Sequence, residues 1–179
     1  MSNKKYIPTI GIEIHTQLAT KSKMFCGCDN DSRNSEPNTN VCPVCLAYPG
    51  TLPTINARAV DLAIKLGQGL NAKIAEHTSF DRKNYFYPDS PKGYQITQMD
   101  EPIIQAGHIE ILVGGEFKKI GIHHAHLEED AGKLTHPEGA TYSLVDYNRA
   151  GTPLVEIVSE PDMHTPEEAR RYLQEIYNI

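Results

Sequence analysis

The sequence lacks an excess of basic residues, a long apolar run and any repeated or low-complexity segment. Its 179 residues include 17 lysines and arginines against 23 aspartates and glutamates, which gives a net charge of −6. A protein that binds nucleic acid by charge alone needs the opposite balance. The composition therefore excludes that class of protein, while a local contact with RNA stays open.

No stretch approaches the roughly 20 apolar residues that a membrane-spanning helix requires. The first residues, 1–5, lead into no apolar core of a signal peptide. We therefore expect a soluble protein of the cytoplasm with no membrane partner. The length suits one domain with a real core and at most a small appended module.

All four cysteines lie in the segment 24–47, here called the cysteine segment, as C-x-C followed by C-x-x-C: Cys26, Cys28, Cys42 and Cys45. Two close pairs of thiolates joined by a polar loop can close a tetrahedral zinc site. Four protein thiolates leave no open position for a substrate, so such a zinc ion is structural. Free thiols are one alternative, and disulfides in an oxidising compartment are another.

The stretch 9–17 alternates isoleucines with polar residues, a pattern typical of a half-buried β-strand. The isoleucines then face the core, whereas Glu13, His15 and Gln17 share the opposite face. An acid and an imidazole side by side indicate a site that binds a ligand between them. The alternative is the solvated outer face of an edge strand.

A second polar stretch follows a hairpin predicted over 107–122. If the returning strand stays extended, His124, His126 and Glu128 lie on one face. The three consecutive acids at 128–130 repel one another unless cations neutralise them. A carboxylate-rich site with one imidazole suits Mg²⁺ or Mn²⁺. The alternative is a solvated acidic turn.

Basic and aromatic residues form a further group. The stretch 78–89 has strand spacing and places Lys83 and Tyr85 on one face, where they could hold a phosphate or stack a base. The alternative is a half-exposed strand whose tyrosines bury their rings. Lys92 and Arg149, each in a predicted turn, are the other basic candidates.

The apolar strand predicted over 153–159 contains one acid, Glu156, which needs a metal ion or a basic group as its partner when buried. Helices are predicted to begin after Asn56 and after Thr165. At the second helix, Thr165 and Glu168 have the spacing of a capping box.

Together these stretches resemble the N-terminal part of the B-subunit family of tRNA-dependent aspartyl/glutamyl-tRNA amidotransferases. The resemblance covers essentially the whole chain. It is carried by six segments: 11–15 (GIEIH), 42–45 (CPVC), 80–88 (FDRKNYFYP), 91–95 (PKGYQ), 126–133 (HLEEDAGK) and 146–162 (DYNRAGTPLVEIVSEPD).

The resemblance implies an α+β fold with a mixed, mostly antiparallel sheet and flanking helices, like the catalytic region of glutamine synthetase, plus a small Cys₄ zinc loop. It implies that ATP phosphorylates the side-chain carboxylate of Glu-tRNA(Gln) or Asp-tRNA(Asn), and that ammonia delivered by the A subunit then displaces the phosphate. The implied cofactors are ATP, Mg²⁺ and structural Zn²⁺. The implied partners are the A and C subunits of a heterotrimer and the mischarged tRNA.

Carried over by position, the resemblance implies three sets of site residues. The Mg²⁺ ligands would be Glu13, His15 and Glu128, with Glu156 and Asp130. Contacts with phosphate or the aminoacyl group would come from Lys83, Lys92 and Arg149, and contacts with the tRNA end or the substrate from Tyr85. The zinc ligands would be Cys26, Cys28, Cys42 and Cys45.

Members of this family continue for several hundred residues beyond such a segment. We therefore expect residues 1–179 to be the N-terminal portion of the cradle (kinase) domain. The rest of the cradle and the helical tail domains would be absent, and this chain alone would be inactive. Two other classes stay open: a non-catalytic zinc module that docks protein or RNA, and a stand-alone metal-dependent hydrolase.

Overall fold

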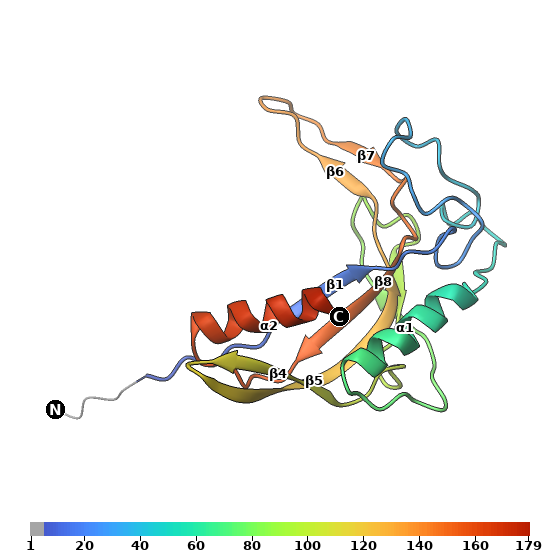
Figure 1. The fold of residues 1–179 in the computed structure, drawn as a ribbon. Helices are drawn as coiled ribbons and strands as arrows, with labels where there is room; N and C mark the ends of the chain where they lie inside the picture. Colours follow the sequence, from blue (N-terminus) through green and yellow to red (C-terminus); the bar gives the residue numbers. More distant parts are fainter. Residues whose placement is uncertain (1–5) are drawn as a thin grey trace.

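The computed structural model of the chain describes residues 6–179, so the segment 1–5 discussed above lies outside the described residues. The described part has the expected α+β fold, built on a mostly antiparallel sheet with two helices (Figure 1). None of the helices formed by residues 6–179 is long and apolar enough to cross a membrane.

The main sheet has the strand order β1-β8-β5-β4, and every neighbouring pair in it is antiparallel. Its strands are β1 (Glu13–Gln17), β8 (Pro153–Ser159), β5 (Glu116–Glu129) and β4 (Gly107–Val113). The predicted hairpin is confirmed as β4 and β5, and the predicted strand 153–159 as β8. The strand predicted over 9–17 begins only at Glu13.

Two small sheets lie beyond the end of the main sheet where β5 finishes. They pair β2 (Asp81–Asn84) with β3 (Tyr94–Thr97), and β6 (Lys133–Thr135) with β7 (Leu144–Asp146). The strand predicted over 78–89 is therefore too long. It ends at Asn84 because the chain then turns, with the Ser90 amide bonded to the Tyr87 carbonyl at 2.9 Å.

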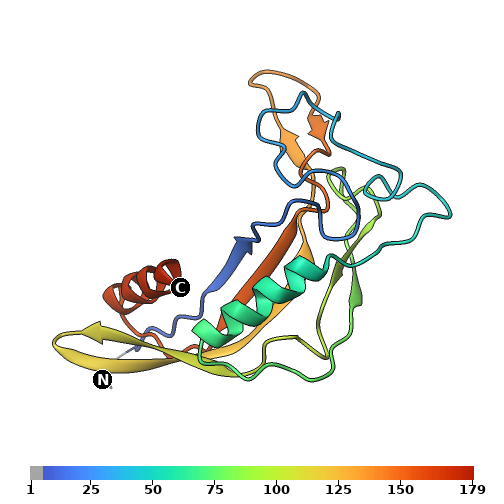
Figure 2. The same ribbon diagram turned by 45° about the vertical axis from the view of Figure 1, so that its right-hand side comes forward.

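The helices α1 (Ala57–Gly69) and α2 (Pro166–Asn178) begin where their caps predicted. The side chain of Asn56 accepts a hydrogen bond from the Arg58 amide, and that of Thr165 accepts one from the Glu168 amide. Both helices pack on one face of the sheet (Figures 1 and 2). Apolar side chains from both helices and the sheet line a cavity between them, including Ile14, Leu62, Ile157 and Ile176. The helices thus cover the apolar face of the sheet and do not cover its polar face.

Candidate functional site

The strand register gathers three polar residues on the face opposite the helices. His15 of β1 and His126 of β5 are both paired with Glu156 of the intervening strand β8. Residues paired in this way point to the same face of a sheet, and so does Glu128, two positions after His126. The expectation that His126 and Glu128 share a face is confirmed.

These four side chains are in contact. His15 Nε2 lies 3.0 Å from Glu128 Oε1 and 3.3 Å from Glu156 Oε2. His126 Nε2 lies 3.5 Å and 3.6 Å from the second oxygen of Glu128 and the same oxygen of Glu156. One ligand atom from each of His15, Glu128 and Glu156 lies within 4.8 Å of the others. Mg²⁺ binds its ligands at about 2.0–2.1 Å, so small side-chain adjustments would let the three share one ion.

The burial of the carboxylates also fits a cation. Glu128 is 2% exposed, and within residues 6–179 the ion pairs of Glu128 and Glu156 are with the two histidines alone. Two carboxylates held this close and away from water require positive charge between them. The Nδ1 atom of His126 is buried and has no hydrogen-bond partner among the described residues.

Two residues expected as metal ligands, Glu13 and Asp130, lie outside this group of close ligand atoms. Glu13 is one strand repeat away from His15 along β1. Its charge acts on His124, whose pKa is lowered to about 4 mainly by burial and against the opposing effect of Glu13. The Oδ2 atom of Asp130 lies 3.2 Å from Arg149 Nε, and burial raises the pKa of Asp130.

The metal-ligand group opens into a cavity of about 510 Å³. Its lining includes most of the residues expected from the sequence: His15, Lys83, Tyr85, Lys92, Glu128 and Asp130. These side chains come from β1, β2, the end of β5 and the turn before β3. The structure therefore brings predicted metal ligands and predicted phosphate contacts into one cavity.

The charge of Lys92 is already neutralised inside this cavity. Its Nζ atom lies 2.7 Å from Oε1 and 2.8 Å from Oε2 of Glu129, which is 3% exposed and also accepts the Ile96 amide. Lys83, by contrast, is exposed, and Tyr85 stacks on Tyr87 with ring centroids 5.8 Å apart. Of these two lysines, Lys92 is ion-paired and Lys83 has no ion pair within residues 6–179.

Arg149 belongs to the turn segment 147–152, between β7 and β8, and is not among the residues that line the cavity. Its guanidinium donates to the carbonyl oxygens of Ala131 at 3.1 Å and Gly132 at 2.9 Å, besides its ion pair with Asp130. That Arg149 contacts phosphate stays a prediction, and in this structure its guanidinium is held by Asp130 and two carbonyl oxygens. Glu129 was not predicted as a site residue, because no local pattern of the sequence connects it with Lys92.

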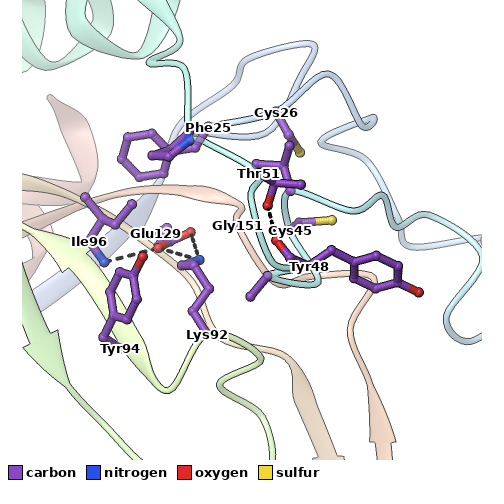
Figure 3. Close-up of a pocket in the computed structure, with 13 residues that line it drawn as sticks. Phe25, Cys26, Cys45, Tyr48, Thr51, Lys92, Tyr94, Ile96, Glu129 and Gly151 are labelled. Carbon is purple, nitrogen blue, oxygen red and sulfur yellow. Dashed lines mark hydrogen bonds and ion pairs between the residues drawn. The ribbon is translucent and has the colours of Figure 1, made fainter.

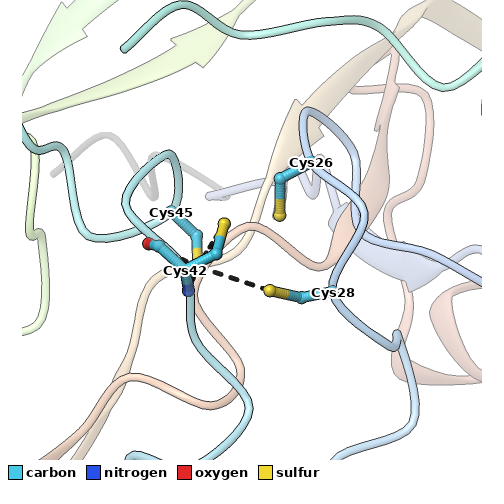
Figure 4. Close-up of side chains that lie close together, drawn as sticks. All are labelled: Cys26, Cys28, Cys42 and Cys45. Carbon is cyan, nitrogen blue, oxygen red and sulfur yellow. Dashed lines mark hydrogen bonds between the residues drawn. The ribbon is translucent and has the colours of Figure 1, made fainter. Parts of the chain in front are cut away.

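The four cysteine sulfurs converge within 4.8 Å of one another (Figure 4). Cys45 Sγ lies 3.8 Å from Cys42 Sγ and 4.0 Å from Cys28 Sγ. A tetrahedral zinc with Zn–S bonds of about 2.3 Å separates its sulfurs by about 3.8 Å, whereas a disulfide needs about 2.05 Å. The Cys26 thiol, followed by the Cys42 amide, lowers the pKa of Cys45 to about 4. The distances between the sulfurs fit a structural zinc ion.

A smaller cavity of about 240 Å³ lies between the cysteine cluster and the Lys92–Glu129 pair. It is lined by Cys26 and Cys45 on one side and by the Lys92–Glu129 pair on the other, with Gly151 close to both (Figure 3). The pair and Gly151 also line the larger cavity. The cysteine cluster and the carboxylate site thus line two different cavities that share the Lys92–Glu129 pair and Gly151.

Comparisons with known proteins agree on one family. Residues 8–179 match the family model described as the GatB/GatE catalytic domain. The chain is 58% identical over 175 residues to the B subunit of an aspartyl/glutamyl-tRNA(Asn/Gln) amidotransferase from Brevibacillus brevis, covering 98% of this chain and 36% of the relative.

Two further relatives with the same description give a similar result. The one from Oceanobacillus iheyensis is 61% identical over 170 residues, covering 95% of this chain and 35% of the relative. The one from Halobacterium salinarum is 54% identical over 174 residues, again covering 95% and 35%. The chain spans about a third of the length of the curated relatives that it matches.

Proposed function

The chain belongs to the family of the GatB/GatE catalytic domain, and we propose that it forms part of the site where a tRNA-dependent amidotransferase activates its substrate. The substrate would be Glu-tRNA(Gln) or Asp-tRNA(Asn), the two tRNAs named in the description of the relatives. The observation that carries the proposal is the meeting of His15, Glu128 and Glu156 at a cavity that also contains Lys83.

In the proposed reaction, a side-chain carboxylate oxygen of the aminoacyl group attacks the γ-phosphorus of ATP, and the bond to the bridging oxygen breaks to release ADP. Ammonia supplied by the A subunit then attacks the carbonyl carbon of the acyl phosphate. Phosphate leaves, the nitrogen loses a proton, and the amide is formed. Such phosphoryl transfer depends mainly on positioning and on charge stabilisation, which acidic metal-binding side chains and lysines provide.

Each site residue has a role in this proposal. His15, Glu128 and Glu156 would hold Mg²⁺, which neutralises the phosphate oxygens when bound. Glu13 and Asp130, which lie outside this group, would add negative charge around the bound ion. A second group of side chains would bind the substrates: Lys83 the phosphates, and Tyr85 the tRNA end by stacking.

The proposal also covers the cysteines, the fold of the complete domain and the partner subunits. The four cysteines would hold a structural zinc ion. The sheet would be the N-terminal part of a cradle like the catalytic region of glutamine synthetase. The complete protein would work with A and C subunits in a heterotrimer, and with the mischarged tRNA.

Metal and nucleotide binding test the proposal on this chain directly. Mn²⁺ serves as a paramagnetic substitute for Mg²⁺, and the free ion is counted by electron paramagnetic resonance, with and without ATP. Glu128→Gln should weaken Mn²⁺ binding at least roughly 10-fold, because it removes a charged ligand. The matched control is Glu110→Gln, on the exposed face of β4, which should bind Mn²⁺ like the unchanged chain. Equal binding by both variants would contradict the proposal.

Activity can be tested in a chimera in which this chain replaces the matching part of the Brevibacillus brevis relative. Phosphate release from ATP should require Glu-tRNA or Asp-tRNA together with the A and C subunits, and Glu128→Gln should abolish it. Turnover without ATP would instead support the metal-dependent hydrolase. A chain that binds zinc but neither Mn²⁺ nor ATP would support the docking module.

A further inference from the structure

The cysteine segment is bonded to the turn segment 147–152 at several partly buried points. The Asn40 amide donates to Asn148 Oδ1 at 2.8 Å, and Asn148 Nδ2 donates to the Glu36 carbonyl at 2.7 Å. The Met24 amide donates to the Gly151 carbonyl at 2.8 Å. Asn148 is itself 2% exposed, so its amide makes these two bonds from a buried position.

The turn segment is also hydrogen-bonded to the residue that follows β5, and it leads directly into β8. The Gly151 amide donates to the Asp130 carbonyl at 2.9 Å, and the Asp130 amide donates to the Thr152 carbonyl at 2.8 Å. Arg149 adds its ion pair with Asp130. Since β5 ends just before Asp130 and β8 begins just after Thr152, these bonds fix the ends of the two strands that carry the site carboxylates.

Gly151 lies at the point where the two sites approach each other. Its φ of +87° favours glycine. A Cβ atom at this position would lie 3.5 Å from Lys23 Cδ, 3.8 Å from Cys45 Cβ and 3.9 Å from Glu129 Oε2. These are ordinary van der Waals distances, so the positive φ, and not a lack of space, favours glycine where the turn lies between the cysteine cluster and the Lys92–Glu129 pair (Figure 3).

Lys23 links the four cysteine sulfurs to Asn40, which is bonded to Asn148. Its side chain is fully buried, and its Nζ atom donates to the Asn40 carbonyl at 2.9 Å and lies 3.7 Å from Cys45 Sγ. A zinc ion with four thiolates carries a net charge of −2, so a buried ammonium beside one sulfur is strongly favoured. Zinc binding would therefore fix Lys23 and Asn40, and through Asn40 the side chain of Asn148.

We propose that the cysteine segment is a positioning element for the carboxylate site, and that Asn148 and Gly151 are the positioning residues that connect them. With zinc bound, the segment holds the turn, and the turn holds Glu128 and Glu156 at metal-binding distance. The inference rests on the proposed function, because it takes zinc for the cysteines and Mg²⁺ for the carboxylates. Coupling between the two ions is then reciprocal.

The test measures Mn²⁺ affinity of the full chain in four states: the unchanged chain and Asn148→Ala, each with zinc and after treatment with a zinc-selective chelator. Thiolates are poor ligands for Mn²⁺, so the probe reports on the carboxylate site. Zinc removal should weaken Mn²⁺ binding by the unchanged chain roughly 10-fold, the usual size of such outer-shell effects. Asn148→Ala should show the same loss while keeping its zinc, and zinc removal should then add little.

The matched control is Asn30→Ala. Asn30 is another buried asparagine of the cysteine segment, but its amide donates to the Leu18 and Thr20 carbonyls and not to the turn segment. This variant should bind Mn²⁺ normally. Hydrogen exchange gives a second readout, since the amides of Asp130 and Gly151 should exchange faster in Asn148→Ala. If Asn148→Ala does not fold, Gly151→Ala takes its place.

Four outcomes would overturn the inference. Zinc-loaded Asn148→Ala could bind Mn²⁺ like the unchanged chain, or the effects of zinc removal and of the substitution could multiply independently. Mn²⁺ binding that depends on Glu128 but not on zinc would overturn this inference and leave the proposed function standing. A chain that binds no Mn²⁺ at all would overturn both.

Discussion

The imidazole of His15 contacts the carboxylate of Glu128 at 3.0 Å across the intervening strand β8. Glu156 of β8 also contacts the same imidazole nitrogen, at 3.3 Å. Three strands therefore contribute one ligand each, and His15 is the contribution of the edge strand β1. Because its side chain is 51% exposed, His15 can be changed with little effect on the core.

We expect His15→Ala to weaken Mn²⁺ binding about 10- to 100-fold, since one of three ligands is lost while both carboxylates stay. The thermal unfolding midpoint should hardly change. Mn²⁺ titration followed by electron paramagnetic resonance measures the effect, and His77→Ala, at an exposed loop position, is the matched control. If His15→Ala binds Mn²⁺ as tightly as the unchanged chain, His15 of β1 is not a ligand of the metal ion.

We expect Lys92→Met to destabilise the fold by about 3 to 5 kcal/mol, because it leaves the buried Glu129 carboxylate without its cation. Adding Glu129→Gln should recover much of this loss, since the buried charge disappears as well. Urea unfolding of the unchanged chain, the two single variants and the double variant measures the coupling energy between Lys92 and Glu129. Lys119→Met, on an exposed position of β5, should be nearly neutral. A loss below about 1 kcal/mol in Lys92→Met would mean that the pair is solvated.

We expect Cys42→Ser to lose the zinc ion and to lower the unfolding temperature, because metal binding to a folded site contributes directly to stability. Zinc content by atomic absorption, together with the visible bands of a Co²⁺-substituted chain, measures occupancy and tetrahedral thiolate geometry. Ser35→Ala, an exposed position in the same segment, should keep its metal. If the unchanged chain is as stable without zinc as with zinc, the four cysteines are free thiols.

A pH effect is expected at the start of α2. The Glu168 carboxylate accepts the His164 amide at 2.6 Å and pairs with Lys118 at 3.0 Å, and the backbone bond, followed by Lys118, lowers the pKa of Glu168. With a lower pKa in the folded chain, the unfolded chain binds more protons just below the ordinary value of 4.5. The stabilisation is therefore complete above 4.5 and is lost as the pH falls through the folded-state pKa.

The corresponding variant is Glu168→Gln. Its unfolding midpoint should lie below that of the unchanged chain at neutral pH, and the two should converge well below pH 4.5. Thermal melts over a pH series measure this difference. Glu138→Gln, at the exposed end of the β6–β7 hairpin, should follow the unchanged chain at every pH. A difference that persists in acid would mean that Glu168 acts through packing.

Local sequence patterns predicted much of the site. The two-residue period of a strand places Glu13 with His15, and His126 with Glu128, before any pairing is known. The helix caps at Asn56 and Thr165 depend on side chains bonding amides two or three residues away, so their starts were predictable as well. The four cysteines could be grouped because their spacing alone lets two pairs meet.

Other features depended on which segments lie side by side. The position of Glu156 between His15 and His126 follows from the placement of β8 between β1 and β5, which no local pattern encodes. Arg149 looked available for phosphate, yet it is bonded to Asp130 and two carbonyls, and Lys92 is paired with Glu129. The sequence by itself determined which residues could bind a metal ion, because strand and helix periodicity are local properties of the backbone. Only the tertiary structure decided which of them meet, because strand order, register and charge pairing are settled by contacts between distant segments.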